Sequence, residues 1–237
     1  MSGKLYALST GPGAADLITV RAARILGSLD ILYAPAGRKG GDSLALSIVR
    51  EYLGEHTEVR CCHFPMSADS AEKEAVWDDV SRALVREVEA GKQVGFITLG
   101  DAMLFSTWVF LLQRIGSPQW LEIVPGVTSF AAIAARAQMP LAMEQQSLAV
   151  VACTAPEAEI ERALAQHDSL VLMKVYGRFP RIKALLANAG LLDNALLMAE
   201  ATLPGEQCWR NLAEVSDDQP LPYFSTILVN KQWGQGQ

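Results

Sequence analysis

Short apolar runs rich in β-branched residues alternate along the chain with longer segments of helical periodicity. The apolar runs predict buried strands at residues 5–8, 29–33, 94–99, 121–124, 148–152, 170–175, 196–198 and 226–229. The periodic segments predict helices at residues 71–90, 106–115, 129–137, 157–166 and 180–189. In residues 71–90, every fourth residue from Val76 to Val88 is apolar and the charged residues lie opposite. This alternation predicts an α/β protein with mostly parallel sheets.

The size of the chain suits two small domains. It has 237 residues, of which 50% are hydrophobic and 19% are charged, enough for two separate cores. Gly116-Ser117-Pro118 is a turn-forming break near the middle of the chain. We therefore expect two α/β domains, residues 1–117 and 118–237.

The charge and hydropathy pattern excludes several classes of protein. With 20 Lys and Arg residues against 26 Asp and Glu residues, the formal net charge is −6, which disfavours nucleic-acid binding. The sequence shows neither an 18-residue apolar run nor the apolar core of a signal peptide. We expect a soluble cytoplasmic protein that binds neither nucleic acid nor membrane.

The cysteines and histidines offer little for a metal site or a catalytic triad. Cys61-Cys62-His63 has the residue types of a metal site, but neighbouring side chains on a strand point to opposite faces. Ordinary burial on a strand is the better interpretation, because free cysteine is among the most buried residue types. With three histidines in the chain, we expect no protein-bound metal.

The turn Gly11-Pro12-Gly13 follows the first predicted strand, and a helix is expected from Thr19. Ligands of open α/β sheets bind where strands end. Asp16 stands where a dinucleotide fingerprint needs a glycine, and Pro12 lacks an N–H. Gly91-Lys92 lacks the spacing of a phosphate-binding P-loop. The sequence therefore predicts a ligand-binding turn that is neither a dinucleotide-binding fingerprint nor a P-loop.

Three further turns carry polar groups beside predicted strands or helices: Arg38-Lys39-Gly40-Gly41-Asp42, Leu99-Gly100-Asp101 and Pro125-Gly126-Val127-Thr128-Ser129. Gly100 allows close approach of the backbone to a ligand, and Asp101 adds a carboxylate. Thr128 and Ser129 place hydroxyls beside the free N–H groups of a helix start. Both hydroxyls have an alternative role as helix caps.

These patterns together resemble the tetrapyrrole (corrin/porphyrin) methyltransferase family. The resemblance rests on residues 8–22, on the block from Val94 through Gly100-Asp101 to Phe105-Ser106, and on Pro125-Gly126. It covers nearly the whole chain. It implies the two-domain fold of class III S-adenosylmethionine-dependent methyltransferases, each domain a mixed sheet flanked by helices. It further implies a homodimer, S-adenosylmethionine in the crevice between the domains, and a tetrapyrrole over a trough of the N-terminal domain.

Residues 33–39 and 172–178 resemble the branch of the family that methylates carbon 20 of precorrin-2. This implies action on cobalt-factor II (cobalt-precorrin-2) in anaerobic cobalamin biosynthesis. Two alternatives remain: the substrate is metal-free precorrin-2, or the protein is a non-catalytic tetrapyrrole carrier. Uroporphyrinogen methylation is disfavoured because Ala102 follows Gly100-Asp101 where those enzymes have proline. A diphthamide-forming methyltransferase would not need Arg38-Lys39, and a dehydrogenase is disfavoured by Asp16 and Pro12.

Position by position, the resemblance implies a set of cofactor-binding residues: Pro12, Leu99, Gly100, Asp101, Leu104, Thr128, Ser129, Met173, Lys174, Ala201 and Thr226. Ala201 stands where relatives often have glycine. The substrate carries many carboxylates, so an acidic protein needs a local basic lining. Arg38 and Lys39 are the candidates for it, with Tyr33 beside them in the matching segment. Lys174, Arg178, Arg181 and Lys183 form a second basic group.

Methyl transfer from a sulfonium to carbon is an in-line displacement by an electron-rich macrocycle. Catalysis can rest on positioning and on exclusion of water, without a Ser-His-Asp or Cys-His set. After methylation the proton on carbon 20 must leave, so a weak base nearby would help. Asp101 is the candidate base. Its alternative role is to accept hydrogen bonds that fix the loop or the cofactor.

Overall fold

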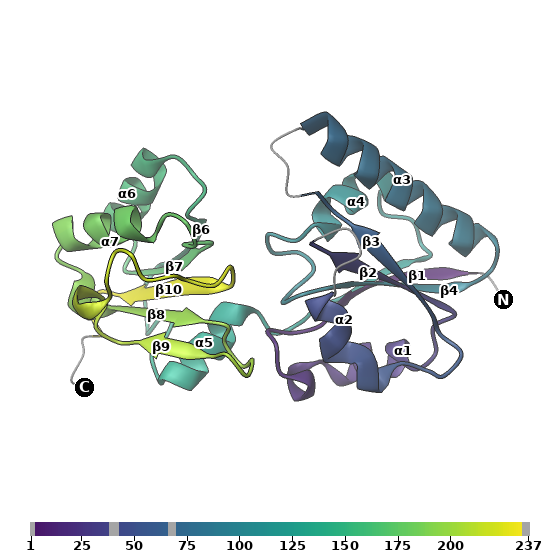
Figure 1. Ribbon diagram of the computed structural model, residues 1–237, viewed down its shortest axis with the longest axis horizontal. Coiled ribbons are helices and arrows are strands. Elements are labelled where there is room, and N and C mark those ends of the chain that lie inside the picture. Colours follow the sequence, from purple (N-terminus) through teal and green to yellow (C-terminus); the bar gives the residue numbers. More distant parts are fainter. Residues whose placement is uncertain (1–2, 38–42, 66–69, 234–237) are drawn as a thin grey trace. The chain divides into compact units, whose positions relative to one another are not determined.

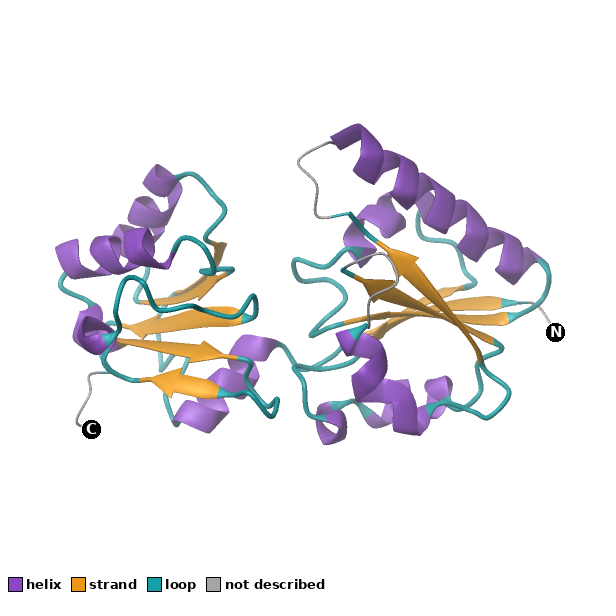
Figure 2. Ribbon diagram, in the orientation of Figure 1, coloured by secondary structure: helices purple, strands orange, loops and turns teal. Residues whose placement is uncertain are grey.

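The computed structural model describes residues 3–37, 43–65 and 70–233, and it divides into two compact units, residues 1–128 and 129–237. Each unit holds a five-stranded sheet. Figure 2 shows helices on both faces of each sheet. The boundary lies after Thr128 and differs from the expected break at 116–118. The reason is that residues 121–124 form a strand of the first sheet, paired in parallel with the first strand of the chain.

The first unit is a parallel α/β sheet with strand order β3-β2-β4-β1-β5, and every strand pairing in it is parallel. Its strands are β1 (Lys4–Ser9), β2 (Ile31–Ala36), β3 (Glu58–His63), β4 (Gln93–Thr98) and β5 (Leu121–Val124). Its helices are α1 (Val20–Leu26), α2 (Leu44–Val49), α3 (Ser70–Glu89) and α4 (Trp108–Ile115). Because the strands run in parallel, the carboxyl ends of β1, β4 and β5 meet at one edge.

Helices cover the two faces of this sheet differently. In Figure 1, α3 and α4 lie on one face and α1 and α2 on the other. The α3 face is packed with large side chains, among them the fully buried Leu84, Phe96 and Trp108. Hydroxyl caps start the helices of the other face, where Thr19 accepts the N–H of Ala22 and Ser43 that of Leu46.

The second unit has strand order β6-β7-β10-β8-β9, and only β6 and β7 pair in parallel among its described strands. Its strands are β6 (Leu148–Ala152), β7 (Ser169–Met173), β8 (Ala195–Ala199), β9 (Gln207–Trp209) and β10 (Ser225–Asn230). Its helices are α5 (Ser129–Ala137), α6 (Glu157–Gln166) and α7 (Phe179–Asn188). The expectation of mostly parallel sheets was therefore wrong for this unit. The α/β class itself is confirmed.

Both faces of the second sheet are covered. Helices α6 and α7 lie on one face and α5 on the other (Figure 1). Residues such as Leu172 and Phe179 fill the α6–α7 side, and Ile133 and Met198 fill the α5 side. The described part of the chain also contains four short 3₁₀ helices, two in each unit: η1 (Ala15–Leu17), η2 (Arg50–Tyr52), η3 (Leu192–Asn194) and η4 (Leu212–Glu214).

Strand β3 is an edge strand of the first sheet, which changes the environment of its cysteines. Cys61 is exposed and Cys62 is half-buried, so the expected burial was wrong for Cys61. Among the described residues, no group of three or more His, Cys, Asp and Glu side chains could hold a metal ion. Within the same part of the chain, the helices are too short or too polar to cross a membrane.

Candidate functional site

The turns after β1 and β4 are joined by backbone hydrogen bonds. Ser9 pairs with Thr98 at the end of the two strands. Beyond them, the N–H of Gly11 donates to the carbonyl of Gly100 at 3.2 Å, and the N–H of Gly100 donates to the carbonyl of Gly11 at 2.7 Å. Both glycines have positive φ, +76° and +71°, a conformation that side-chain-bearing residues rarely adopt. The two glycine turns of the sequence therefore form one feature.

The hydroxyl of Ser9 connects this feature to β5. It donates to the carbonyl of Val124 at 2.7 Å and accepts the N–H of Ala102 at 2.9 Å. Ser9 is fully buried. One hydroxyl thus joins the ends of β1 and β5 to the loop after β4. Its one signal in the sequence is its position directly before Thr10-Gly11-Pro12-Gly13, and Ser9 was not among the predicted site residues.

Asp101 ties the loop after β4 to the loop after β5. One carboxylate oxygen accepts the N–H of Met103 at 2.9 Å, and the other accepts the N–H of Gly126 at 2.8 Å. Hydrogen bonds from backbone N–H groups to a carboxylate are charge-assisted and hold a loop firmly. This geometry fits the alternative role of Asp101, an acceptor that fixes the loop.

Close packing on one side of these turns contrasts with open space on the other. A Cβ added to Gly126 would lie 2.5 Å from both the carbonyl oxygen of Gly100 and the Cβ of Ser9. A Cβ added to Gly100 would meet no atom within 4 Å. Thr10 is fully buried, and its hydroxyl has no hydrogen-bond partner in the described part of the chain. The backbone of Gly100 is therefore accessible to a ligand on its open side.

The other predicted cofactor residues of the first unit lie along the same loops. Pro12 is buried within the turn after β1, and Leu99 and Leu104 are half-buried on either side of Asp101. Thr128 ends the first unit and Ser129 begins α5; both are half-buried.

The predicted cofactor residues of the second unit gather at one end of its sheet. Thr226 in β10 pairs with both Met173, the last residue of β7, and Met198 near the end of β8. Lys174 follows Met173 with a φ of +59°. Ala201 lies two residues beyond the end of β8 and is buried against the α5 side of the sheet. The antiparallel direction of β10 brings these positions together.

Tyr33 lies in the core, away from the surface. Its side chain is 4% exposed on β2, and its hydroxyl accepts a hydrogen bond from Arg60 Nη1 at 2.9 Å. Arg60 also forms ion pairs with Glu58 and Glu87, and these partners, Glu58 first, raise the pKa of its guanidinium. The role of Tyr33 in substrate binding stays a prediction, and its burial leaves little of the ring for a ligand. Arg38 and Lys39 lie outside the described residues.

Three members of the second basic group have partners within the second unit. Arg178 Nη1 donates to the carbonyls of Cys153 and Ala155, and Arg181 pairs with Glu157. Lys183 donates to the carbonyl of Val215 and to Asp217. These contacts stabilise loops and helices, which leaves the three cations less suited to binding a carboxylate-rich substrate.

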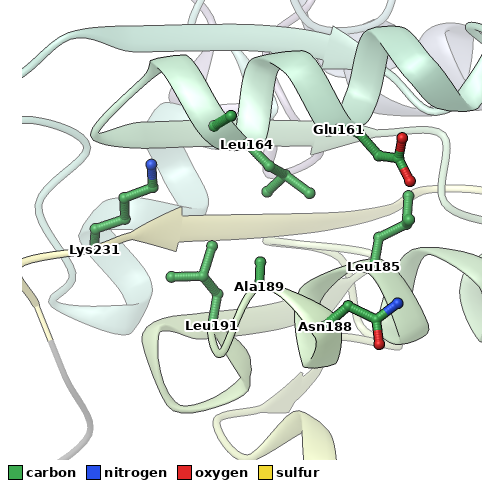
Figure 3. Close-up of a pocket in the computed structure, with 8 residues that line it drawn as sticks. Glu161, Leu164, Leu185, Asn188, Ala189, Leu191 and Lys231 are labelled. Atoms are coloured by element: carbon green, nitrogen blue, oxygen red, sulfur yellow. The ribbon is translucent and has the colours of Figure 1, made fainter.

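A pocket of about 460 Å³ lies in the second unit, between α6, α7 and the residue that follows β10 (Figure 3). Its lining is mainly apolar, with Glu161, Asn188 and Lys231 as polar members. None of the predicted site residues lines it. Because Lys231 follows the carboxyl end of β10 whereas Thr226 is at its start, the pocket lies toward the opposite end of the sheet.

Comparisons with known proteins identify the family of the chain. The sequence profile of the Tetrapyrrole (Corrin/Porphyrin) Methylases matches residues 4–216. The cobalt-precorrin-2 C(20)-methyltransferase of Salmonella typhimurium (strain LT2) is 86% identical over 233 residues, covering 98% of each chain. The precorrin-2 C(20)-methyltransferase of a Sinorhizobium species is 32% identical over 238 residues, covering 96% of this chain and 95% of the relative.

The fold also matches that of a solved structure. The solved structure of a cobalamin biosynthetic enzyme, a cobalt precorrin-4 methyltransferase, matches with a TM-score of 0.72 at 25% identity, covering 96% of this chain and 94% of that chain. The expected two-domain α/β fold is confirmed by this match. On the profile, the full-length relatives and the fold, the chain belongs to the tetrapyrrole (corrin/porphyrin) methylase family.

Proposed function

We propose that this protein transfers a methyl group from S-adenosylmethionine to carbon 20 of cobalt-precorrin-2 (cobalt-factor II) in cobalamin biosynthesis. The observation that carries the proposal is the 86% identity, over 98% of both chains, to a cobalt-precorrin-2 C(20)-methyltransferase. Identity at this level leaves few positions at which a binding site could have changed. The relative whose name gives precorrin-2 without cobalt is 32% identical, which favours the cobalt-containing substrate.

The turns of the first unit fit the methyl donor. Gly100 offers backbone groups beside open space, and the loops around it are fixed by Ser9 and Asp101. Bound there, S-adenosylmethionine supplies an electrophilic methyl group. The chain's own part is to hold the donor in line with carbon 20 and to exclude water, because the electron-rich macrocycle is itself the nucleophile.

We propose two groups of cofactor contacts, one in each unit. The first group is at the strand ends of the first unit: Pro12, Leu99, Gly100, Asp101, Leu104 and Thr128. The second group is in the second unit: Ser129, Met173, Lys174, Ala201 and Thr226. Substituting one member of each group tests the proposal. Thr128→Val and Thr226→Val should each weaken S-adenosylhomocysteine binding in calorimetry, and an unchanged affinity in either would remove that group.

Two roles for Asp101 give different kinetics. As a base, Asp101→Asn should lower kcat far more than it weakens cofactor binding. As a loop tie, the same change places an amide N–H₂ opposite the N–H of Met103 or Gly126, so cofactor affinity and kcat should fall together. The two hydrogen bonds support the second role, and the base remains a prediction that this comparison of kcat with affinity decides.

We propose that Arg38 and Lys39 bind carboxylates of the tetrapyrrole. The planar guanidinium of arginine and the ammonium group of lysine both recognise carboxylates, whatever the net charge of the protein. The double change Arg38→Glu/Lys39→Glu should raise the KM for the tetrapyrrole and leave the KM for S-adenosylmethionine unchanged. An unaltered KM for the tetrapyrrole would remove this assignment.

The experiment that tests the proposed function supplies cobalt-loaded and metal-free precorrin-2 side by side, with a ¹³C-methyl donor. We expect release of S-adenosylhomocysteine, a new methyl signal at carbon 20 by NMR, and faster turnover of the cobalt-loaded substrate. Methyl transfer to another carbon would contradict the assigned position. Binding of the tetrapyrrole without release of S-adenosylhomocysteine would instead identify a carrier.

We further propose a cytoplasmic homodimer without a metal ion of its own, in which cobalt enters only inside the substrate. The dimer rests on the family resemblance, and the absence of a metal centre rests on the small number of histidines in the sequence. Light scattering on a sizing column should give twice the mass of the chain, and elemental analysis of the purified protein should find no stoichiometric metal. A monomer, or one equivalent of zinc, would contradict the respective part.

A further inference from the structure

The turn between β8 and β9 has an unusual backbone. Glu200 has a φ of +50° and Thr202 a φ of +67°, so two non-glycine residues in left-handed conformation flank Ala201. Thr202 is β-branched, and for such a residue a positive φ is a genuine outlier. Backbone of this kind persists only where the surroundings impose it, and it gathers at ligand sites.

One carboxylate holds this turn from the inside. Glu206 Oε2 accepts the N–H of Thr202 at 2.7 Å, four residues earlier in the chain. Two backbone hydrogen bonds also form within the turn. The N–H of Leu203 donates to the carbonyl of Glu200 at 2.9 Å, and the N–H of Glu206 donates to the carbonyl of Leu203 at 3.0 Å. Glu206 is thus the side chain that closes the turn around Ala201.

Arg136, in the last turn of α5, fixes this carboxylate from the outside. Its Nε and Nη2 donate to Glu206 Oε1 at 3.1 and 2.8 Å, and Nε also lies 3.2 Å from Oε2. The guanidinium, more than the N–H of Thr202, holds the pKa of Glu206 below its ordinary value of 4.5. The carboxylate is therefore ionised, and both its oxygens are occupied, at neutral pH.

Two further features link helix α5 to the segment 200–210. Arg210, just beyond β9, donates from Nη2 to the carbonyl of Ala137 at the end of α5, at 2.7 Å. Ala201 is 6% exposed and belongs to the core cluster that includes Ile133 of α5. Helix α5 and the segment 200–210 therefore form one connected substructure, and Ala201 sits within it.

We propose that Arg136 and Glu206 are positioning residues that hold the turn at Ala201 in the conformation that binds the methyl donor. The inference rests on the proposed function, because Ala201 is assigned to the cofactor there. In this role neither side chain needs to contact the donor. The pair acts by keeping the left-handed backbone of Glu200 and Thr202 in place, so that the peptide groups beside Ala201 are preorganised for binding.

The test measures S-adenosylhomocysteine binding to full-length Glu206→Gln by calorimetry. The substituted amide cannot accept from both Thr202 and Arg136 with its two terminal atoms, because one of them is now a donor. We expect Kd to rise roughly fivefold, and the KM for S-adenosylmethionine to rise with it while kcat is nearly unchanged. Arg136→Lys keeps the charge but loses the paired N–H groups. Its Kd for S-adenosylhomocysteine should therefore lie between that of wild type and that of Arg136→Ala.

A matched ion pair in the same unit provides the control. Arg181 on α7 pairs with Glu157 on α6 through two hydrogen bonds. The side-chain exposure of Arg181 is 58%, against 60% for Arg136. Glu157→Gln removes a pair of similar exposure that supports none of the proposed cofactor residues. We expect it to leave Kd unchanged.

Three outcomes separate the possibilities. Weakened binding in Glu206→Gln but not in Glu157→Gln supports the positioning role. Equal affinity in wild type and Glu206→Gln, with a similar loss of melting temperature in both variants, overturns it and makes the pair merely structural. Failure of wild type to bind S-adenosylhomocysteine would instead contradict the proposed function itself.

Discussion

At the scale of single residues, Ser9 makes the strongest case for a test. Its buried hydroxyl donates to the carbonyl of Val124 and accepts the N–H of Ala102. In Ser9→Ala both backbone groups lose their partner inside the protein, where an unsatisfied polar group costs about 1–3 kcal/mol. We expect the free energy of unfolding in urea to fall by that amount and S-adenosylhomocysteine to bind more weakly.

Ser28 supplies the control for this prediction. Its hydroxyl also donates to a backbone carbonyl, that of Ile25, but the contact is local and exposed. Water replaces the lost partner there, so Ser28→Ala should change the free energy of unfolding by less than about 0.5 kcal/mol. A similar decrease in the free energy of unfolding in the two variants would show that the hydrogen bonds of Ser9 stabilise the protein no more than that of Ser28.

The four cysteines should differ widely in reactivity, since the thiolate is the reactive form. Burial raises the pKa of the Cys153 thiol to about 12 and that of Cys62 to about 11. A raised pKa lowers the thiolate fraction at mildly alkaline pH, and burial blocks the reagent as well. Cys61 and Cys208 are exposed, so we expect them to react first with a disulfide reagent.

Mass spectrometry of partly labelled protein checks this order. Cys153 should be labelled only after urea is added, when all four thiols become accessible. Raising the pH toward the pKa of Cys62 should speed its labelling in the folded protein. Labelling of Cys153 in the folded protein as fast as that of Cys61 would contradict the burial on which the prediction rests.

At the scale of elements, the close contact between the turns after β4 and β5 predicts the effect of a substitution at Gly126. The turn after β5 lies so close to the turn after β4 that a Cβ on Gly126 would come within 2.5 Å of the carbonyl oxygen of Gly100. The obstacle is backbone, which cannot move aside as a flexible side chain would. Gly126→Ala should therefore separate the loops and break the hydrogen bond to Asp101. We expect a loss of about 1–3 kcal/mol in stability and a severe loss of methyl transfer.

Gly37→Ala is the comparison for this change. A Cβ at Gly37 would meet no atom within 4 Å, and its φ lies outside the left-handed region. Alanine there should be neutral or slightly stabilising, because it restricts the unfolded chain. Urea unfolding and the rate of S-adenosylhomocysteine release measure both variants. A fully active and stable Gly126→Ala would contradict the close approach of the two loops.

Most elements could be predicted from the sequence because their signals are local. The buried strands are continuous apolar runs, and the amphipathic α3 carries its spacing within its own residues. Strand β9 is short and its first two residues are exposed, so no run marks it. The antiparallel direction of β10 depends on pairing with distant β7 and β8, which no local pattern encodes.

The same distinction applies to the candidate site. Glycine turns can be located in a sequence because positive φ and close approach require glycine, as at Gly11 and Gly100. The partners of Ser9 and Glu206 could not be predicted in this way. Ser9 joins a carbonyl 115 residues away, and the ion pair of Glu206 joins it to Arg136, 70 residues earlier. The register of the sheets decides such contacts.

At the scale of the whole molecule, the cores of the two units are separate. Each described cluster of buried apolar side chains lies within one unit, with Leu84 in the first and Leu172 in the second. Both leucines are fully buried. Leu→Ala at such positions costs about 2–5 kcal/mol, from lost burial and from the cavity left behind.

The two substitutions should therefore destabilise different parts of the chain. We expect Leu84→Ala to speed amide hydrogen exchange in β1–β5 and α1–α4, and Leu172→Ala to speed it in β6–β10 and α5–α7. Exchange followed by mass spectrometry of peptides resolves the two regions in one experiment. The loops after β1 and β4 should keep their protection in Leu172→Ala, because Ser9 and Asp101 hold them within the first unit. Equal acceleration across both regions in either variant would show that the units unfold as one, and that the division after Thr128 carries no energetic meaning.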